Sequence, residues 1–214
     1  MKKNLLKCVT FVFIILICII SLVKLSIPKE NNSESEGAKT SSVKKSNPVS
    51  FRPYKDPDDI APEGSWNEKS ESKAYPKINN KEKNLSIRVS LKGNRVYLLK
   101  NNKVVYTMLS TAGMFKGGKS MTPTGTFKIR SNRGETFFNK KLNEGAHNWT
   151  SWDPTNVYLF HSVPTKENGK FNIKEANKLG KDQGSHGCIR LSIPDSHWLM
   201  KNIPVGTKVV IKND

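Results

Sequence analysis

The sequence predicts a mainly β fold: one compact β-rich domain with short helical insertions, over residues 84–214 of a 214-residue chain. Three observations predict it. Residues 85–90 alternate with period two, the pattern of a half-buried strand. Residues 95–100 and 103–110 form two further strand-like runs, and the Asn101-Asn102 pair between them is typical of a hairpin turn.

The rest of this region is also predicted to be mainly β. Further strands are expected over 125–131, 156–162, 188–193 and 207–212. Two short helices are expected, one over about 173–179 that ends at Gly180, the other over 194–201 with Ser192 as its cap and Pro194 in its first turn.

An apolar run, residues 5–23, occupies the N-terminus. Nineteen residues of helix span about 28 Å, close to the thickness of a bilayer core. A cleaved signal peptide is the alternative, but residues 22–28 contain no small-x-small cleavage site. Basic residues precede the run, so residues 1–28 are predicted to be a cytoplasmic basic stub and a transmembrane signal anchor, which places the remainder outside the cell membrane.

Residues 29–83 are predicted to be a polar extracytoplasmic linker. They are rich in Lys, Glu, Ser, Asn and Pro and hold few aliphatic residues, so they cannot form a core of their own. The aromatic residues Phe51, Tyr54, Trp66 and Tyr75 exceed what a spacer needs, which leaves open that they dock on the domain or on a partner.

Charge is concentrated in residues 84–214, which carry 21 basic and 8 acidic side chains, a net charge of +13. Such a field attracts polyanions. No nucleic acid is expected as a partner, because the region is predicted to face away from the cytoplasm and holds no nucleic-acid motif. Anionic wall polymers suit the predicted compartment, and a merely soluble lysine-rich surface is the alternative.

Cys188 is the one cysteine outside the apolar run, since Cys8 and Cys18 lie within it. A domain with a single cysteine closes no internal disulfide, so Cys188 is either a free thiol with a chemical role or a buried structural residue. A nucleophilic thiol needs a base, an orienter for that base and donors for an oxyanion.

Four histidines are candidates for the base. His186 shares a face with Cys188 in an extended segment, whereas His161 closes a predicted strand and precedes Ser162, whose hydroxyl or carbonyl could orient an imidazole. Spacing alone does not separate these two. His147, in a predicted loop over 144–148, and His197, on the last helix, have ordinary surface or packing interpretations.

Zinc binding by Cys188, His186 and His161 is the competing interpretation. A structural zinc site uses four ligands, and the usual CxxC and HxxxH spacings are absent from the sequence. Neither a metal nor a cofactor is therefore expected.

Three motifs in order carry a resemblance to a known family: Thr-Pro-Thr-Gly-Thr-Phe at 122–127, Phe-His-Ser at 160–162 and Ser-His-Gly-Cys-Ile-Arg-Leu at 185–191. Together they resemble the L,D-transpeptidase catalytic domain, also called the YkuD domain, over about residues 84–213. The resemblance implies a β-sandwich-like fold, a catalytic domain at 84–214 and peptidoglycan stem peptides as substrates.

The resemblance also implies roles for single residues. Cys188 is expected to be the nucleophile, His161 the proton donor and acceptor, and Ser162 its orienter. Around them, the resemblance assigns Ser185, His186 and Gly187 to the nucleophile loop and its oxyanion region, and Arg190, Thr124 and Gly125 to substrate binding. For Arg190, holding a stem-peptide carboxylate and a structural role are both open.

The implied reaction has two steps. Cys188 cleaves the terminal D-Ala from a tetrapeptide stem through a thioester, and an acceptor amine then takes the acyl group, which gives a third-to-third cross-link. Water as acceptor would make an L,D-carboxypeptidase, a protein amine would make an attachment enzyme, and a non-catalytic wall-binding module is the alternative from another class. The 23 residues between His161 and Ser185 exceed the usual spacing, so an insert around 166–181 is expected to form a lid.

Overall fold

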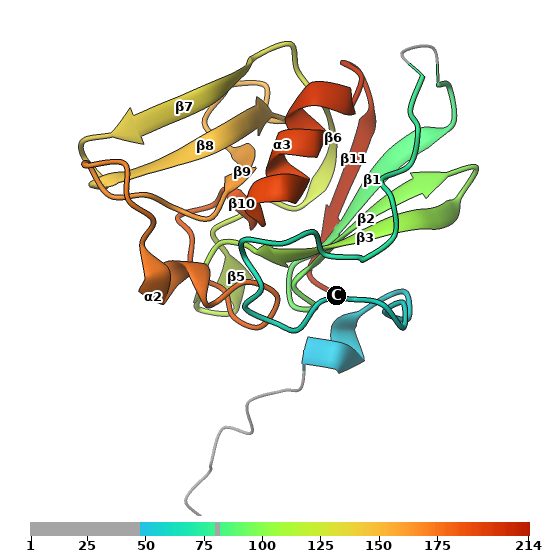
Figure 1. Cartoon of the computed structure of the whole chain (residues 1–214), viewed down its shortest axis with the longest axis horizontal. Helices are drawn as coiled ribbons and strands as arrows, with labels where there is room; N and C mark the ends of the chain where they lie inside the picture. The colour runs from blue at the N-terminus through green and yellow to red at the C-terminus, as the bar shows by residue number, and fades with distance from the viewer. Residues whose placement is uncertain (1–47, 80–81) are drawn as a thin grey trace, which may run out of the picture. The chain divides into compact units, whose positions relative to one another are not determined.

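The computed structural model describes residues 48–79 and 82–214 and has a mainly β fold, as predicted (Figure 1). One sheet has nine strands in the order β6-β11-β1-β2-β3-β10-β9-β8-β7, and β4 and β5 form a small second sheet. The strands are β1 (Leu85–Ser90), β2 (Arg95–Lys100), β3 (Lys103–Thr111), β4 (Phe115–Lys116), β5 (Lys119–Ser120), β6 (Gly125–Lys128), β7 (Arg133–Asn139), β8 (Glu144–Ser151), β9 (Leu159–Ser162), β10 (Ile189–Leu191) and β11 (Lys208–Lys212). The helices are the 3-10 helix η1 (Pro48–Phe51), α2 (Ile173–Ala176) and α3 (Ile193–Asn202).

The predicted first hairpin is confirmed. Asn101 and Asn102 have φ of 52° and 60°, and two consecutive positive φ values suit the tight turn that joins β2 to β3. The two predicted helices are also present, and the Ser192 side chain accepts a hydrogen bond from the Asp195 amide, which caps α3.

The β7–β8 hairpin is the part of the sheet that the sequence reading missed. The segment 144–148, expected to be a loop, lies in β8 and pairs with β7. Neither strand shows a strict alternation of buried and exposed positions, so the period-two pattern is absent. Gly134 lies beneath the Trp149 ring, where a Cβ would come within 2.7 Å of the indole nitrogen, so this pairing depends on a glycine.

The two halves of the sheet share one core. In Figure 1, β7 and β8 lie on the left, β1 to β3 on the right, and α3 lies between them. The core joins Ile87 and Val209 from one half with Phe160 and Ile189 from the other, together with Trp198 from α3. Burial of these apolar faces against one another is what holds the sandwich-like arrangement together.

Two parallel strand pairs set the positions on which the site depends. β1 pairs with β11, and β9 pairs with β10. In the second pair, Ile189 lies beside Phe160 and Arg190 beside His161. Because side chains alternate along a strand, Cys188, two residues before Arg190, is directed to the same side of the sheet as His161.

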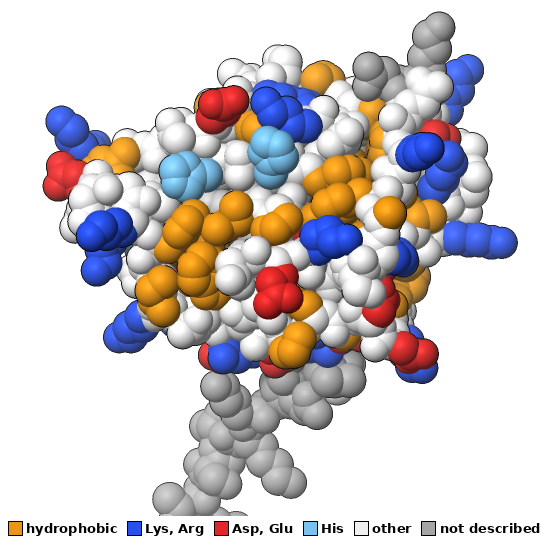
Figure 2. All heavy atoms as spheres, in the orientation of Figure 1, with side chains coloured by type: hydrophobic (Ala, Val, Ile, Leu, Met, Phe, Trp, Pro, Cys, Tyr) orange, Lys and Arg blue, Asp and Glu red, His pale blue; other side chains and the backbone are white. Residues whose placement is uncertain are grey.

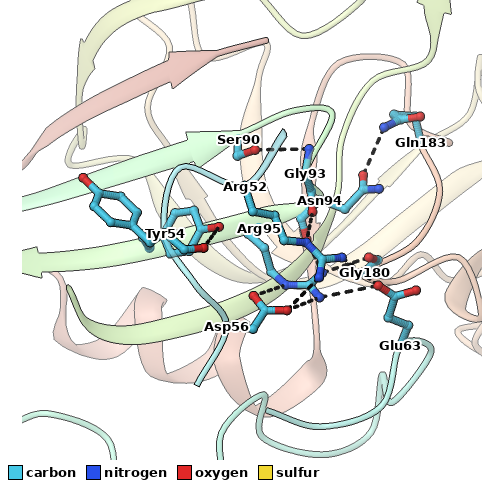
Figure 3. Close-up of polar contacts among 11 residues, drawn as sticks. Arg52, Tyr54, Asp56, Glu63, Ser90, Gly93, Asn94, Arg95, Gly180 and Gln183 are labelled. Carbon is cyan, nitrogen blue, oxygen red and sulfur yellow. Dashed lines mark hydrogen bonds and ion pairs between the residues drawn. The ribbon is translucent and has the colours of Figure 1, made fainter. Parts of the chain in front are cut away.

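Residues 51–79, which we call the strap, pack on the domain although they fall within the predicted linker. Arg95 of β2 is buried, and its guanidinium contacts Asp56 at 2.8 Å and donates to the Gly180 carbonyl at 2.8 Å (Figure 3). Arg52 contacts Asp56 and Glu63, each at 2.7 Å. This cluster ties the start of the strap to β2 and to the segment after α2.

The second half of the strap covers one edge of β3. The amides of Leu109 and Thr107 donate to the side chains of Ser70 and Glu71, which therefore take the place of a neighbouring strand. The Tyr75 ring stacks on Trp198 at 5.0 Å between centroids, and its hydroxyl donates to Asp195 at 2.7 Å. Composition alone predicts a flexible linker here, because the strap has too few apolar residues to form a core of its own. It is held instead by polar contacts and by a few apolar side chains that pack on the core of the domain.

The predicted signal anchor and the first part of the predicted linker lie outside the described residues. Within residues 48–79 and 82–214, the structure contains no helix that is both long and apolar enough to cross a membrane.

Because Asp56 pairs with a buried arginine and Asp58 with an exposed lysine, we expect substitutions of these two strap residues to differ in their effect on stability. Asp56→Asn removes the nearer of the two carboxylates that contact the buried Arg95 guanidinium and leaves Glu63 at 3.5 Å, so the free energy of unfolding should fall by about 3 kcal/mol. Asp58→Asn is the matched control, because Asp58 and its partner Lys55 are both almost fully exposed, and it should change stability by less than about 0.5 kcal/mol. Urea titration of both variants measures the difference, and equal stabilities would contradict this account of the strap.

Candidate active site

A pocket of about 360 Å³ at the β7–β8 hairpin brings together four of the predicted site residues. Cys188, His161, Ser185 and His186 all line it. The remaining wall is contributed by Phe137, Asn139, Leu142, Glu144, Trp149, Asn156, Val157 and Leu159. A thiol and an imidazole 27 positions apart in sequence thus open into one cavity.

The nucleophile loop is held by the side chain of Ser185. Its hydroxyl donates to the Cys188 carbonyl at 2.5 Å and accepts from the Gly187 amide at 3.0 Å. Gly187 has φ of 133°, and a Cβ there would lie 2.2 Å from Cε1 of Tyr158, so only glycine fits. Because the Gly187 amide is bound by Ser185, the nearby amide left as a candidate oxyanion donor is that of Cys188.

Thr122 also supports the nucleophile loop, and the sequence analysis assigned it no role of its own. Its hydroxyl accepts from the Gly113 amide at 2.8 Å and donates to the Gly187 carbonyl at 2.9 Å. The signal was present, since Thr122 begins the Thr-Pro-Thr-Gly motif, but a contact with a residue 65 positions later cannot be read from a turn pattern. Thr124 and Gly125, expected to bind substrate, lie at the start of β6 and do not line the pocket.

His161 is buried and oriented by a carbonyl. Its Nδ1 lies 2.6 Å from the Ser162 carbonyl oxygen, which can only accept, so Nδ1 carries the proton and Nε2 the lone pair. The Ser162 hydroxyl is engaged elsewhere: it accepts from the His147 amide and donates to the Val163 carbonyl. Burial, and next the positive charge of Arg190, lower the pKa of His161 to about 3, so the ring is neutral at pH 7.

The thiol is also uncharged at rest. Burial, with smaller contributions from the charges of Glu144 and Asp153, raises the pKa of Cys188 to about 11, although a backbone hydrogen bond from Leu159 and the charge of Arg190 act in the opposite direction. In the structure the thiol donates to the Val157 carbonyl, with Sγ 3.9 Å from the oxygen. A neutral thiol and a neutral imidazole with a lone pair on Nε2, both lining one pocket, suit a nucleophile that loses its proton to a general base during the reaction.

Arg190 does not present its guanidinium to a substrate. Its side chain is 1% exposed, and it contacts Glu144 at 2.6 Å and Glu175 at 2.9 Å. Of the two interpretations left open by the sequence, the structure therefore shows the structural one: both ends of the guanidinium are held by carboxylates of this chain.

The other candidates lie outside the pocket. The ring of His147 packs edge-on against Phe171, and His197 on α3 has its Nδ1 3.3 Å from Asn148. None of the residues that line the pocket comes from 163–184, so the insert that was expected to form a lid is not part of its wall. Among the residues that the structure describes, no three His, Cys, Asp or Glu side chains are grouped closely enough to hold a metal ion.

Residues 84–211 match the family model of the L,D-transpeptidase catalytic domain, YkuD, and the chain therefore belongs to this family. A relative from Bacillus subtilis (strain 168), YciB, is an L,D-transpeptidase by provisional assignment. The two sequences are 44% identical over 137 residues, which are 64% of this chain and 69% of YciB.

Solved structures similar to this chain include the following two, each of which covers 60% of it. A fused Zn-dependent amidase/peptidase/peptidoglycan-binding domain-containing protein from Clostridium acetobutylicum is 28% identical, with a TM-score of 0.44 over 60% of this chain and 52% of that one. An L,D-transpeptidase from Mycobacterium smegmatis is 16% identical, with a TM-score of 0.49 over 60% and 58%. The chain thus spans less than two thirds of the length of these solved chains.

The raised pKa of Cys188 predicts the pH dependence of its alkylation. Because only the thiolate reacts, the rate with iodoacetamide should rise about tenfold per pH unit from pH 7 to 9 and level off only near pH 11. Mass analysis of the peptide that contains Cys188 separates it from Cys8 and Cys18, and free cysteine, which levels off above pH 8.5, is the reference. A plateau below pH 7 would instead reveal a thiolate–imidazolium pair.

Proposed function

We propose that this chain is a peptidoglycan-remodelling L,D-transpeptidase. The observation that carries the proposal is the shared pocket of Cys188 and His161, in which the Nδ1 contact with Ser162 leaves the lone pair of the imidazole on Nε2. Membership of the family supports the same class of reaction. No cofactor enters the chemistry, because thiol, base and amide donor are all supplied by the chain.

In the first step Cys188 attacks the carbonyl of the third residue of a tetrapeptide stem. His161 takes the thiol proton at Nε2, and the Cys188 amide donates to the oxyanion. The proton then passes to the nitrogen of the terminal D-Ala, the C–N bond breaks and a thioester remains. Ser185 and Thr122 act in this step by fixing the loop that carries the thiol.

In the second step an acceptor amine attacks the thioester. A new C–N bond forms, His161 takes a proton from the attacking amine at Nε2, and it passes this proton to the sulfur as the C–S bond breaks. A side-chain amine of a second stem's third residue gives a third-to-third cross-link. Water is the alternative acceptor, and its attack on the thioester would make the chain an L,D-carboxypeptidase.

We also propose that the domain acts at the outer side of a membrane, held there by the apolar residues 5–23. The supporting observation is the substrate class itself, since a wall peptide is met outside the cytoplasm.

Incubation of the purified chain with a disaccharide-tetrapeptide tests the catalytic proposal. Mass analysis should show loss of D-Ala with dimers that link third residues, together with a transient mass increase at Cys188. Cys188→Ala and His161→Ala should lower the rate of D-Ala release by at least about 10³-fold, because each removes a partner of the proton transfer.

The control is His197→Ala, which removes an imidazole that lies outside the pocket and should leave the rate within about twofold. Tripeptide without dimer would identify the carboxypeptidase. Binding of the glycopeptide with no product from any variant would contradict catalysis and favour the wall-binding module.

A second proposed function, docking of an anionic wall polymer, is supported by the outer face of β6, β11 and β1. On the face in Figure 2, Lys and Arg side chains are scattered over the surface rather than gathered in one patch. By contrast, Lys83, Lys208 and Lys212 line one groove of about 630 Å³, and no Asp or Glu is among the described residues of its lining. Lys128 lies directly opposite Lys208, and such like-charged pairs destabilise a sheet unless an anion offsets them.

Charge reversal tests this docking. Lys208→Glu with Lys212→Glu should weaken binding of the chain to linear polyphosphate at least about tenfold and reduce its salt dependence. Lys116→Glu with Lys119→Glu, on the exposed β4–β5 pair, makes the same change in net charge elsewhere and is the matched control. Equal losses in both double variants would show that net charge alone attracts the polyanion.

A further inference from the structure

Glu144 places a carboxylate in the lining of the pocket that contains Cys188. It is the first residue of β8, where it pairs with Asn139 of β7. Among the described residues that line this pocket, it is the one Asp, Glu, Lys or Arg. The rest of the lining is apolar, amide, hydroxyl, thiol or imidazole, so among these residues the Glu144 carboxylate is the charged group that a ligand in the cavity can meet.

The carboxylate of Glu144 is held in place from behind. Its Oε2 accepts from the buried Arg190 guanidinium at 2.6 Å, and Arg190 is shared with Glu175, which in turn contacts Lys178 at 2.6 Å. The charges of these four side chains balance. Glu144 is the member of the set that lines the pocket, with its side chain 20% exposed.

The charge of Glu144 does not favour the first half of the reaction. It raises the pKa of the Cys188 thiol, whereas the buried Arg190 behind it lowers that pKa and has the larger effect of the two. The same negative charge of Glu144 attracts a cationic group. The acceptor of the second half-reaction is such a group, since a primary alkylamine is protonated in neutral water.

We propose that Glu144 forms a subsite for the primary ammonium group of the acceptor. This inference rests on the transpeptidase function proposed above and deepens it: the pocket selects a cationic amine over water. In a cavity with a largely apolar wall, a carboxylate attracts an ammonium group more strongly than it would in bulk solvent.

The protons of the second half-reaction balance in this arrangement. The ammonium group bound at Glu144 gives one proton to solvent and becomes an amine. The amine nitrogen attacks the thioester carbonyl and gives a second proton to Nε2 of His161, and His161 passes it to the Cys188 sulfur as the C–S bond breaks. One amide bond replaces one thioester, and the enzyme returns to its neutral resting state.

The test compares two acceptors on the same acyl-enzyme. The full chain is acylated with a disaccharide-tetrapeptide, and the products formed with Nα-acetyllysine, which is cationic, and with hydroxylamine, which is uncharged at neutral pH, are measured by mass analysis. Glu144→Gln should reduce the ratio of lysine to hydroxylamine product about tenfold. The ratio is independent of how fast each variant is acylated.

Glu175→Gln is the matched control. It removes the other carboxylate from the same guanidinium, but Glu175 does not line the pocket, so the ratio should stay at the value of the unaltered chain. An equal fall in both variants would show that the carboxylates act only through Arg190, and an unchanged ratio in Glu144→Gln would show that the pocket does not sense the acceptor's charge. Either result overturns the inference.

The unaltered chain supplies a second measurement that needs no variant. Added salt should raise the KM for Nα-acetyllysine several-fold and leave that for hydroxylamine unchanged, because salt screens the ion pair alone. A KM for the lysine acceptor that is insensitive to salt would contradict the subsite. Absence of any acyl-enzyme would overturn the proposed function itself, whereas an acyl-enzyme that does not discriminate between the acceptors overturns this inference alone.

Discussion

The buried guanidinium of Arg190 is the interaction on which the candidate site depends. It joins β10 to the start of β8 through Glu144 and to α2 through Glu175. It also lies beside His161 in the β9–β10 register and lowers the pKa of that imidazole. One side chain therefore holds three segments together and helps keep the base neutral, and its removal would leave Glu144 without this partner and Glu175 with Lys178 alone.

The strap adds a second constraint, from outside the residues that match the family. The Gly64 amide donates to the Leu179 carbonyl, before the nucleophile loop, and the Trp66 carbonyl accepts from the Ile193 amide, after it. With Arg95 bound to Gly180 as well, both ends of the segment that carries Cys188 are tied to the strap. The geometry of the thiol thus depends on residues that composition alone assigns to a tether.

The kind of contact involved decides which parts of the fold and of the site could be predicted from the sequence. β1 was predictable because apolar and polar residues alternate along it, β2 because the Asn101-Asn102 pair marks a hairpin turn, and Cys188 with His161 stood in recognisable motifs, although burial itself does not alternate in either strand. The strap was not, since the hydrogen bonds that strand amides donate to the side chains of Ser70 and Glu71 leave no periodic pattern. The partners of Arg190 lie 46 and 15 positions away, and no local spacing connects them.

These constraints also bear on which part of the site can respond to a substrate. The insert expected to be a lid is fixed at three places: Glu175 binds Arg190, Phe171 packs on Trp66, and the Gly180 carbonyl accepts from Arg95. The pocket wall comes instead from the β7–β8 hairpin, whose connection includes the exposed Leu142. A substrate in the pocket would therefore meet this hairpin, in which Glu144 is the residue that contacts the buried guanidinium.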